Sequence, residues 1–154
     1  MNKSDKLDEL RLEIGMIADK VNSRHEFYLG IITTIARHVP EYFGVAIYQC
    51  IDNCYSIFAS YGNISENLNV KFGDGMFSIC SIRGKVTIHN ELYATKAYAP
   101  FYNEQHVIGV LYVEVHNAKY QVTDEDRIFL QEVTRYIEVR GKQYENSIVD
   151  NNDV

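Results

Sequence analysis

Two glycines on either side of an aspartate, Gly73-Asp74-Gly75, stand directly before a segment with helical character at 76–83. Glycine adopts backbone conformations that other residues avoid, so the chain can turn sharply here and start a helix. The first N–H groups of a helix have no partner within it, and those of Met76, Phe77 and Ser78 would form a seat for a small anion. The alternative is that the glycines only turn the chain and that Asp74 caps these N–H groups.

Aromatic and polar side chains elsewhere could complete a small binding site. Tyrosine hydroxyls would donate hydrogen bonds and Lys96 would add a positive charge, which suits a small anion or polar metabolite. The expected ligand-binding residues are Met76, Phe77, Ser78, Ile88, Tyr93, Lys96, Tyr98, Tyr112 and Glu114. Two alternatives stay open: Glu114 is a solvated carboxylate on an open sheet face, or the aromatic side chains fill the pocket themselves.

The three cysteines favour structural roles. A nucleophilic thiol needs an activating environment, whereas free cysteines are among the most buried residues, so Cys80 is expected in the core and no catalytic residue is assigned. Cys50 and Cys54 flank a turn and would face each other if three residues formed the loop, but two ordinary strand residues are the favoured interpretation. The five histidines show no ligand spacing, so neither a metal site nor a cofactor is expected.

The hydrophobic periodicity predicts which elements position these residues. Spacings of three and four predict an amphipathic helix over 7–21 and a second one over 24–38 that Pro40 ends. Period-two patterns predict strands at 44–51, 54–60, 69–72, 86–90, 96–102 and 107–116, with a brief helix at 76–83. Thr123 followed by three acidic residues predicts a capping box that starts the last helix.

This order of elements indicates an α+β fold. We expect a five- or six-stranded, mainly antiparallel sheet with the N- and C-terminal helices packed on one face and a small pocket on the other. Alternation places Val110, Tyr112 and Glu114 on the pocket side of their strand, and the wholly apolar residues between them on the helix side. The expected organisation is a dimerisation helix at 1–23, a domain at 24–145 and a disordered tail at 146–154.

Composition limits the class of protein. The chain has 154 residues, of which 46% are hydrophobic and 23% are charged, as in ordinary globular domains. Its net charge of −6 and the lack of any run of Lys or Arg argue against nucleic acid as a partner. The apolar stretches are too short for a membrane span, the first residues do not form a signal peptide, and three cysteines suit a reducing compartment, so a cytoplasmic location is expected.

The order of elements, together with Gly73-Asp74-Gly75, Ala99-Pro100-Phe101, the strand 107–111 and the helix start at 123–126, resembles the GAF domain family over about residues 24–142. The resemblance implies a sensor module that holds a small ligand between its sheet and a roof, often as a dimer through its terminal helices. Between Asn90 and Lys96 the chain is shorter than in larger family members, which argues against a large ligand.

Two branches of the family are similar in part. In free methionine-(R)-sulfoxide reductases a cysteine lies two residues beyond the second glycine, where this chain has Phe77. Two carboxylates of that branch fall on Tyr112 and Glu114, and a third acidic position falls on Lys96. Only Glu114 keeps an acidic side chain, so the amine-binding site of that branch is not retained. The stand-alone nitrate receptors are also somewhat similar, being single domains of this size.

The sequence therefore predicts a stand-alone sensor that binds a small polar or anionic metabolite and relays it to a sensor kinase or transcription regulator. A homodimer is expected, because the apolar stripe of residues 7–21 could pair with a second chain. Its alternative is that this helix folds back over its own domain. Two other functions stay open: a thiol-dependent reductase of free methionine sulfoxide acting through Cys80, and a dimeric scaffold with a filled pocket.

Overall fold

The computed structural model describes residues 2–144, so the tail expected at 146–154 lies outside the described residues. The helices are α1 (Lys3–Gly15), α2 (Arg24–His38), α3 (Gly75–Arg83) and α4 (Asp124–Arg140), with 3₁₀ turns η1 (Ile17–Asp19) and η2 (Gly141–Tyr144). The strands are β1 (Tyr42–Ile51), β2 (Cys54–Gly62), β3 (Asn69–Lys71), β4 (Thr87–Asn90), β5 (Ala94–Asn103) and β6 (His106–His116). Each predicted strand is present, and its bounds differ from the prediction by a few residues.

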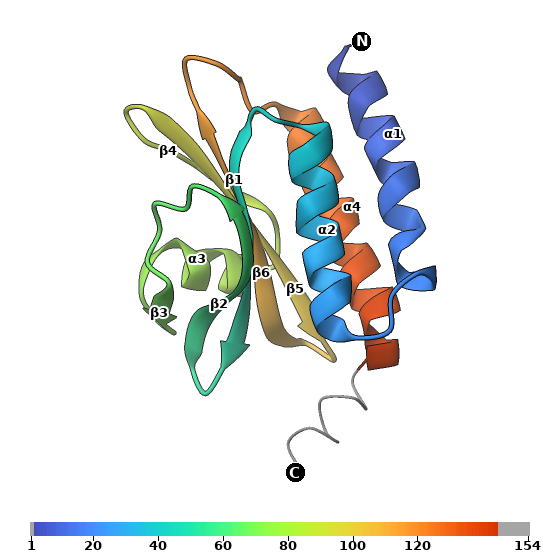
Figure 1. Ribbon diagram of the computed structural model, residues 1–154. Helices are drawn as coiled ribbons and strands as arrows, with labels where there is room; N and C mark the ends of the chain where they lie inside the picture. The colour runs from blue at the N-terminus through green and yellow to red at the C-terminus, as the bar shows by residue number, and fades with distance from the viewer. Residues whose placement is uncertain (1, 145–154) are drawn as a thin grey trace.

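The strands form one antiparallel sheet in the order β3-β2-β1-β6-β5-β4. Helices α1, α2 and α4 lie on one face and α3 lies on the other (Figure 1). The expected α+β fold is therefore confirmed. No helix within residues 2–144 is long and apolar enough to cross a membrane.

The helix-covered face carries the main core. Leu111, Val113 and Val115 of β6 are at most 2% exposed and pack with residues of α1, α2 and α4. The intervening Val110 and Tyr112 belong to a second buried cluster on the α3 side. The alternation predicted for this strand is thus confirmed, and each face of the sheet carries its own buried cluster.

Helix α1 is shorter than its hydrophobic pattern predicts. It ends at Gly15, a poor helix former, and a 3₁₀ turn replaces the expected continuation towards Val21. Its apolar residues Leu7, Leu10 and Ile14 are at most 3% exposed within this single chain. The apolar stripe of α1 is thus buried against its own domain, as in the fold-back alternative. The homodimer stays a prediction, and it would have to form through a different surface.

Two local features fix the sheet. Asp52 and Asn53 form a two-residue turn, both with positive φ, which pairs Cys50 with Tyr55. Cys50 and Cys54 therefore project from opposite faces of the hairpin and do not meet across a three-residue loop. At Gly109, an added Cβ would lie 2.3 Å from the Phe101 ring and 2.6 Å from the Tyr48 carbonyl oxygen, so these strands approach as closely as they do only because glycine is there.

The start of α4 is confirmed as a capping box. Thr123 accepts a hydrogen bond from the N3 backbone, and Asp126 accepts one from the backbone N–H of Thr123 at 2.8 Å. Asp126 is 1% exposed and also accepts hydrogen bonds from Lys3, Tyr42 and Tyr120. Burial opposes its charge, but these donors lower the pKa of Asp126 below its ordinary value. One carboxylate therefore ties α4 to both α1 and β1.

Candidate functional site

Aromatic side chains occupy the space between α3 and the sheet. Phe77 of α3 is 1% exposed, and its ring centroid lies 4.5 Å from that of Tyr48, 5.1 Å from that of Tyr98 and 5.5 Å from that of Tyr55. Tyr112 closes the cluster, 5.3 Å from Tyr98. The small pocket expected on this face is thus filled, as in the alternative in which aromatics occupy it, because four tyrosines of the sheet converge on one phenylalanine.

The glycine turn delivers Phe77 into this cluster. Gly73 and Gly75 both have positive φ, as the sequence suggested, and α3 begins at once. Asp74 makes no side-chain cap on the helix; instead the Ser78 hydroxyl accepts a hydrogen bond from the Gly73 N–H at 2.7 Å. Met76 is half-buried and packs on the aromatic cluster. The start of α3 therefore serves the packing of this face, and the anion seat stays a prediction.

A polar network surrounds the tyrosine hydroxyls at one edge of the cluster. It is closed by the segment 63–68 between β2 and β3, which we call the cover loop. Lys96 and Tyr98 of β5 both donate to the same oxygen, Oε1 of Glu66 in that loop, at 3.1 and 2.6 Å. Lys96 also pairs with Glu91 at 3.1 Å. Two donors of the sheet thus converge on a carboxylate that a loop supplies.

Lys96 is charged although its side chain is only 7% exposed. Burial by itself would lower its pKa, but the hydrogen bonds that it donates to Glu66 and Glu91 raise the pKa of Lys96 above its ordinary value. Burial, and then the hydrogen bond to Glu66, raises the pKa of Tyr98 well above 10, so its hydroxyl stays a donor. The pair Lys96 and Tyr98 is therefore a fixed site for one negatively charged oxygen.

Glu114 lies beside this pair and is 5% exposed. Its Oε1 accepts hydrogen bonds from the Tyr112 hydroxyl and from both the backbone N–H and the hydroxyl of Ser65 in the cover loop. Tyr48 donates to the backbone carbonyl of Asn67 at 3.0 Å, which gives the loop another attachment. Glu114 is thus buried and tied to the loop, rather than solvated on an open sheet face.

The structure brings together seven of the nine residues expected at the site: Met76, Phe77, Ser78, Lys96, Tyr98, Tyr112 and Glu114. Two corrections follow. Ile88 packs against the helix-side core, and Tyr93 is 78% exposed, so neither reaches the cluster. Ile88 lies on β4, a strand too short for its alternation to show which side chains face α3. Tyr93 lies in the three-residue connection to β5, whose path the sequence does not specify.

The cover loop was missed by the sequence analysis. Ser65, Glu66 and Asn67 lie in a polar stretch without periodicity that reads as an ordinary connection. The available signal is charge: a buried Lys96 needs a carboxylate partner, and the sequence offers Glu66 and Glu91 equally.

Cys80 is also in the aromatic cluster, and it is fully buried. Burial raises the pKa of its thiol to about 12, so almost no thiolate exists at neutral pH. The thiol approaches the Phe77 carbonyl oxygen at 3.2 Å. These features fit a core residue, as the sequence analysis expected.

Cavities are found elsewhere in the described chain. One of about 210 Å³ lies between α1 and the start of β1, and one of about 130 Å³ lies between α1 and α4. Two open hollows adjoin His116, one of them lined by Tyr93. None of these four is lined by the aromatic cluster, so a ligand that reached Lys96 and Tyr98 would first have to move the cover loop.

No family model and no curated protein sequence matches the chain. Solved structures do match. The free methionine-R-sulfoxide reductase from Neisseria meningitidis, solved in complex with its substrate, has a TM-score of 0.82 and 16% identity, over 96% of this chain and 95% of that one.

Two further structures are GAF domains. One comes from a phosphoenolpyruvate-protein phosphotransferase of Coxiella burnetii, with a TM-score of 0.80 and 13% identity over 96% of this chain and 99% of that one. The other is the nlh2 GAF domain of A. aeolicus in an inactive state, with a TM-score of 0.76 and 16% identity over 92% of this chain and 99% of that one. From a sheet of this order, flanked by terminal helices on one face and α3 on the other, and from these likenesses, we conclude that the chain has the GAF fold.

Proposed function

We propose that this chain is a GAF-like sensor domain that binds a small anion, such as a carboxylate, at Lys96 and Tyr98. The observation that carries the proposal is the convergence of these two buried donors on Glu66 Oε1. Glu66 belongs to a loop and not to the sheet, so the carboxylate in the site can leave while the donors stay in place. A ligand carboxylate would take over its two hydrogen bonds.

The attachments of the cover loop set the cost of opening. Besides the two hydrogen bonds to Glu66, three side-chain hydrogen bonds hold it: two from Ser65 to Glu114 and one from Tyr48 to the Asn67 carbonyl. A hydrogen bond contributes about 1 kcal/mol net, so opening costs a few kcal/mol and the open state is a minor one. The ligand's apparent affinity is reduced by the small population of that state.

The size of the site limits the ligand. Because the aromatic cluster is filled, the ligand occupies the volume that Glu66 and the neighbouring loop vacate, which suits a molecule of a few heavy atoms. Binding replaces the cover loop over β1, β5 and β6, which pack through their other face on α1, α2 and α4. A shift of these helices would relay the ligand to a signalling partner such as a kinase or transcription regulator, and the free energy for it is the ligand's differential affinity for the two states.

The test is a thermal unfolding screen of the whole chain with acetate, succinate and nitrate at constant ionic strength. A ligand that binds only the folded state at 100 times its Kd stabilises by about 2.7 kcal/mol. We expect a saturable rise in Tm for at least one carboxylate, lost in Lys96→Met and kept in Lys20→Met, an exposed lysine of the same length. A blank screen would defeat the proposal.

A blank screen would favour the second candidate, a scaffold with a filled pocket. The packing of Phe77 among four tyrosines is the observation that supports that candidate. The reductase function, suggested by the Neisseria neighbour, is the weakest of the three, because Cys80 is buried and its raised pKa disfavours the thiolate.

A further inference from the structure

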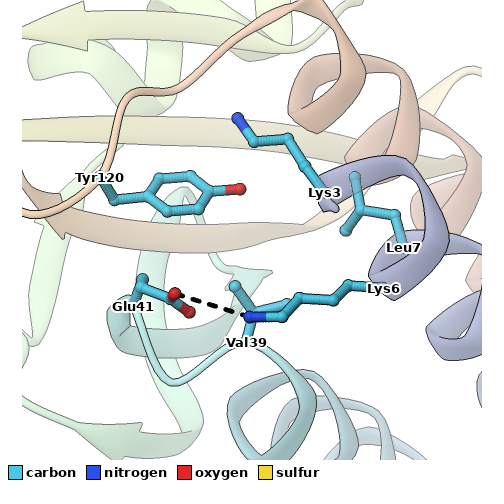
Figure 2. A pocket seen from close by; sticks show the side chains of 6 residues that line it. All are labelled: Lys3, Lys6, Leu7, Val39, Glu41 and Tyr120. Atoms are coloured by element: carbon cyan, nitrogen blue, oxygen red, sulfur yellow. Dashed lines mark ion pairs between the residues drawn. The ribbon is translucent and has the colours of Figure 1, made fainter. Parts of the chain in front are cut away.

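A second candidate site lies on the opposite side of the sheet, at the N-terminal end of α1. A cavity of about 210 Å³ is lined by Lys3, Lys6 and Leu7 of α1, by Val39 and Glu41 before β1, and by Tyr120 before α4 (Figure 2). Figure 2 shows Lys6 extending to Glu41, whereas Lys3 extends towards Tyr120. The two lysines therefore serve different purposes.

Lys3 has no capacity left for a ligand. Its ammonium donates to the Gln121 carbonyl at 2.8 Å, to the Thr123 hydroxyl at 3.1 Å and to Asp126 at 2.8 Å, which uses all three of its protons. The Tyr120 hydroxyl is likewise occupied, because it donates to Asp126. These residues therefore line the cavity without offering a free donor to a ligand.

Lys6 and Glu41 do have unused capacity. Their charged atoms, Nζ and Oε2, are 3.6 Å apart, which makes an ion pair longer than a hydrogen bond, and the Lys6 ammonium makes no other polar contact within residues 2–144. The Glu41 side chain as a whole is 36% exposed, so its charge is partly solvated, but the buried Oε1 lacks a donor that a ligand from outside the chain could supply.

The cavity thus presents a cation with free N–H groups, an orphaned anionic acceptor, and two apolar side chains, Leu7 and Val39. We propose that it binds a small zwitterion with an ammonium and a carboxylate on neighbouring carbons, of which a short α-amino acid is the simplest. The ligand's ammonium donates to Glu41 Oε1, its carboxylate accepts from Lys6, and its side chain contacts Leu7 and Val39. Because the charges of ligand and site alternate, each is neutralised by a neighbour.

The cavity volume agrees with this class of ligand. It exceeds what a single water needs several times over, yet it is below the range of drug-sized pockets, about 300–1,000 Å³. The site is independent of the anion site at Lys96, because it lies among α1, β1 and the segment before α4.

The experiment is an amide NMR titration of the whole chain with glycine and L-alanine. We expect saturable shifts confined to residues 3–7, 39–42 and 120–123, with the 63–68 and 96–98 amides unmoved. Acetate and methylammonium, which each carry half of the zwitterion's charges, should bind at least ten times more weakly. Lys6→Met and Glu41→Gln should each weaken L-alanine binding at least tenfold.

Two matched variants control for changes in charge alone. Lys20→Met and Glu9→Gln alter exposed residues with no ion pair in the described chain, and they should leave the affinity unchanged. Unfolding curves that match the parent within a few degrees establish that Lys6→Met and Glu41→Gln fold. An absence of saturable shifts means that water alone fills the cavity and overturns the proposal. Acetate that shifts the amides around this cavity with the same affinity as L-alanine, or undiminished affinity in Lys6→Met, also overturns it.

Discussion

The two faces of the sheet both bury side chains at their centre, but these side chains differ in kind. The helix-side face of β6 offers Leu111, Val113 and Val115, which need no polar partner. The α3-side face offers tyrosines: Tyr48 and Tyr98 donate to the cover loop, and Tyr112 donates to Glu114. The first face stabilises the fold, whereas the second combines packing with a set of donors, and it is at the second that we propose the exchange of Glu66 for a ligand carboxylate.

The largest expected effect is on the helix-side face. Leu111→Ala removes a fully buried side chain and should lower the free energy of unfolding by about 3 kcal/mol. The adjacent Tyr112→Phe, on the α3 side, should cost only about 1 kcal/mol, because Glu114 keeps its two donors from Ser65. Urea denaturation measures both. Equal costs would mean that the two faces do not differ as described.

The next effect concerns Asp126, the buried carboxylate on the helix side. Asp126→Asn should cost about 2–3 kcal/mol at pH 7, because it weakens four hydrogen bonds to a charged group. The pKa of Asp126 is lowered by folding, so its stabilisation is present above the unfolded pKa of about 3.9 and is lost as pH falls through the folded value.

Unfolding curves at several pH values provide the measurement for Asp126. The difference between parent and Asp126→Asn should shrink below about pH 4. The exposed neighbour Asp124 supplies the control, since Asp124→Asn should cost less than about 0.5 kcal/mol. A difference between parent and Asp126→Asn that stays constant down to pH 2 would contradict this account.

The smallest expected effect sharpens the comparison at the α3-side face. Glu66→Ala leaves Lys96 and Tyr98 without their shared acceptor and should cost about 1–2 kcal/mol. Added acetate should restore much of the loss, since it can supply the missing carboxylate. Thermal unfolding with and without acetate measures the recovery.

Two controls define the acetate effect. Glu9→Ala removes an exposed carboxylate and should gain no more from acetate than the parent does. In the double variant Glu66→Ala with Lys96→Met, the recovery should disappear because the buried cation is gone. If acetate stabilises all three variants alike, it acts as a general cosolute and the exchangeable-carboxylate model fails.

The fold was largely predictable from local patterns. Period-two alternation in β6 assigned Leu111 and Tyr112 to opposite faces, and the Thr123 capping box located the start of α4. These features depend on neighbours within a few residues, which a single sequence displays. The early end of α1 was missed, since a hydrophobic stripe continues through Ile17 although the helix stops at Gly15.

The candidate site was predictable only in part. Its strand residues follow from alternation, but Glu66 is 30 residues from Lys96 and 32 from Tyr98, and nothing local links them. Whether the pocket is open or filled depends on how four tyrosines and Phe77 share one volume, which the spacing of residues does not specify. The cavity at Lys6 and Glu41 likewise arises from the packing of three distant segments.

The close approach at Gly109 has an evolutionary consequence. Since the Phe101 ring occupies the place of any Cβ there, a change of Gly109 is tolerable only after Phe101 has become smaller, and the Tyr48 carbonyl would still have to move. The order of mutation matters, and the two positions cannot drift independently. Lineages descended from this chain are therefore expected to keep the glycine, or to replace the pair together.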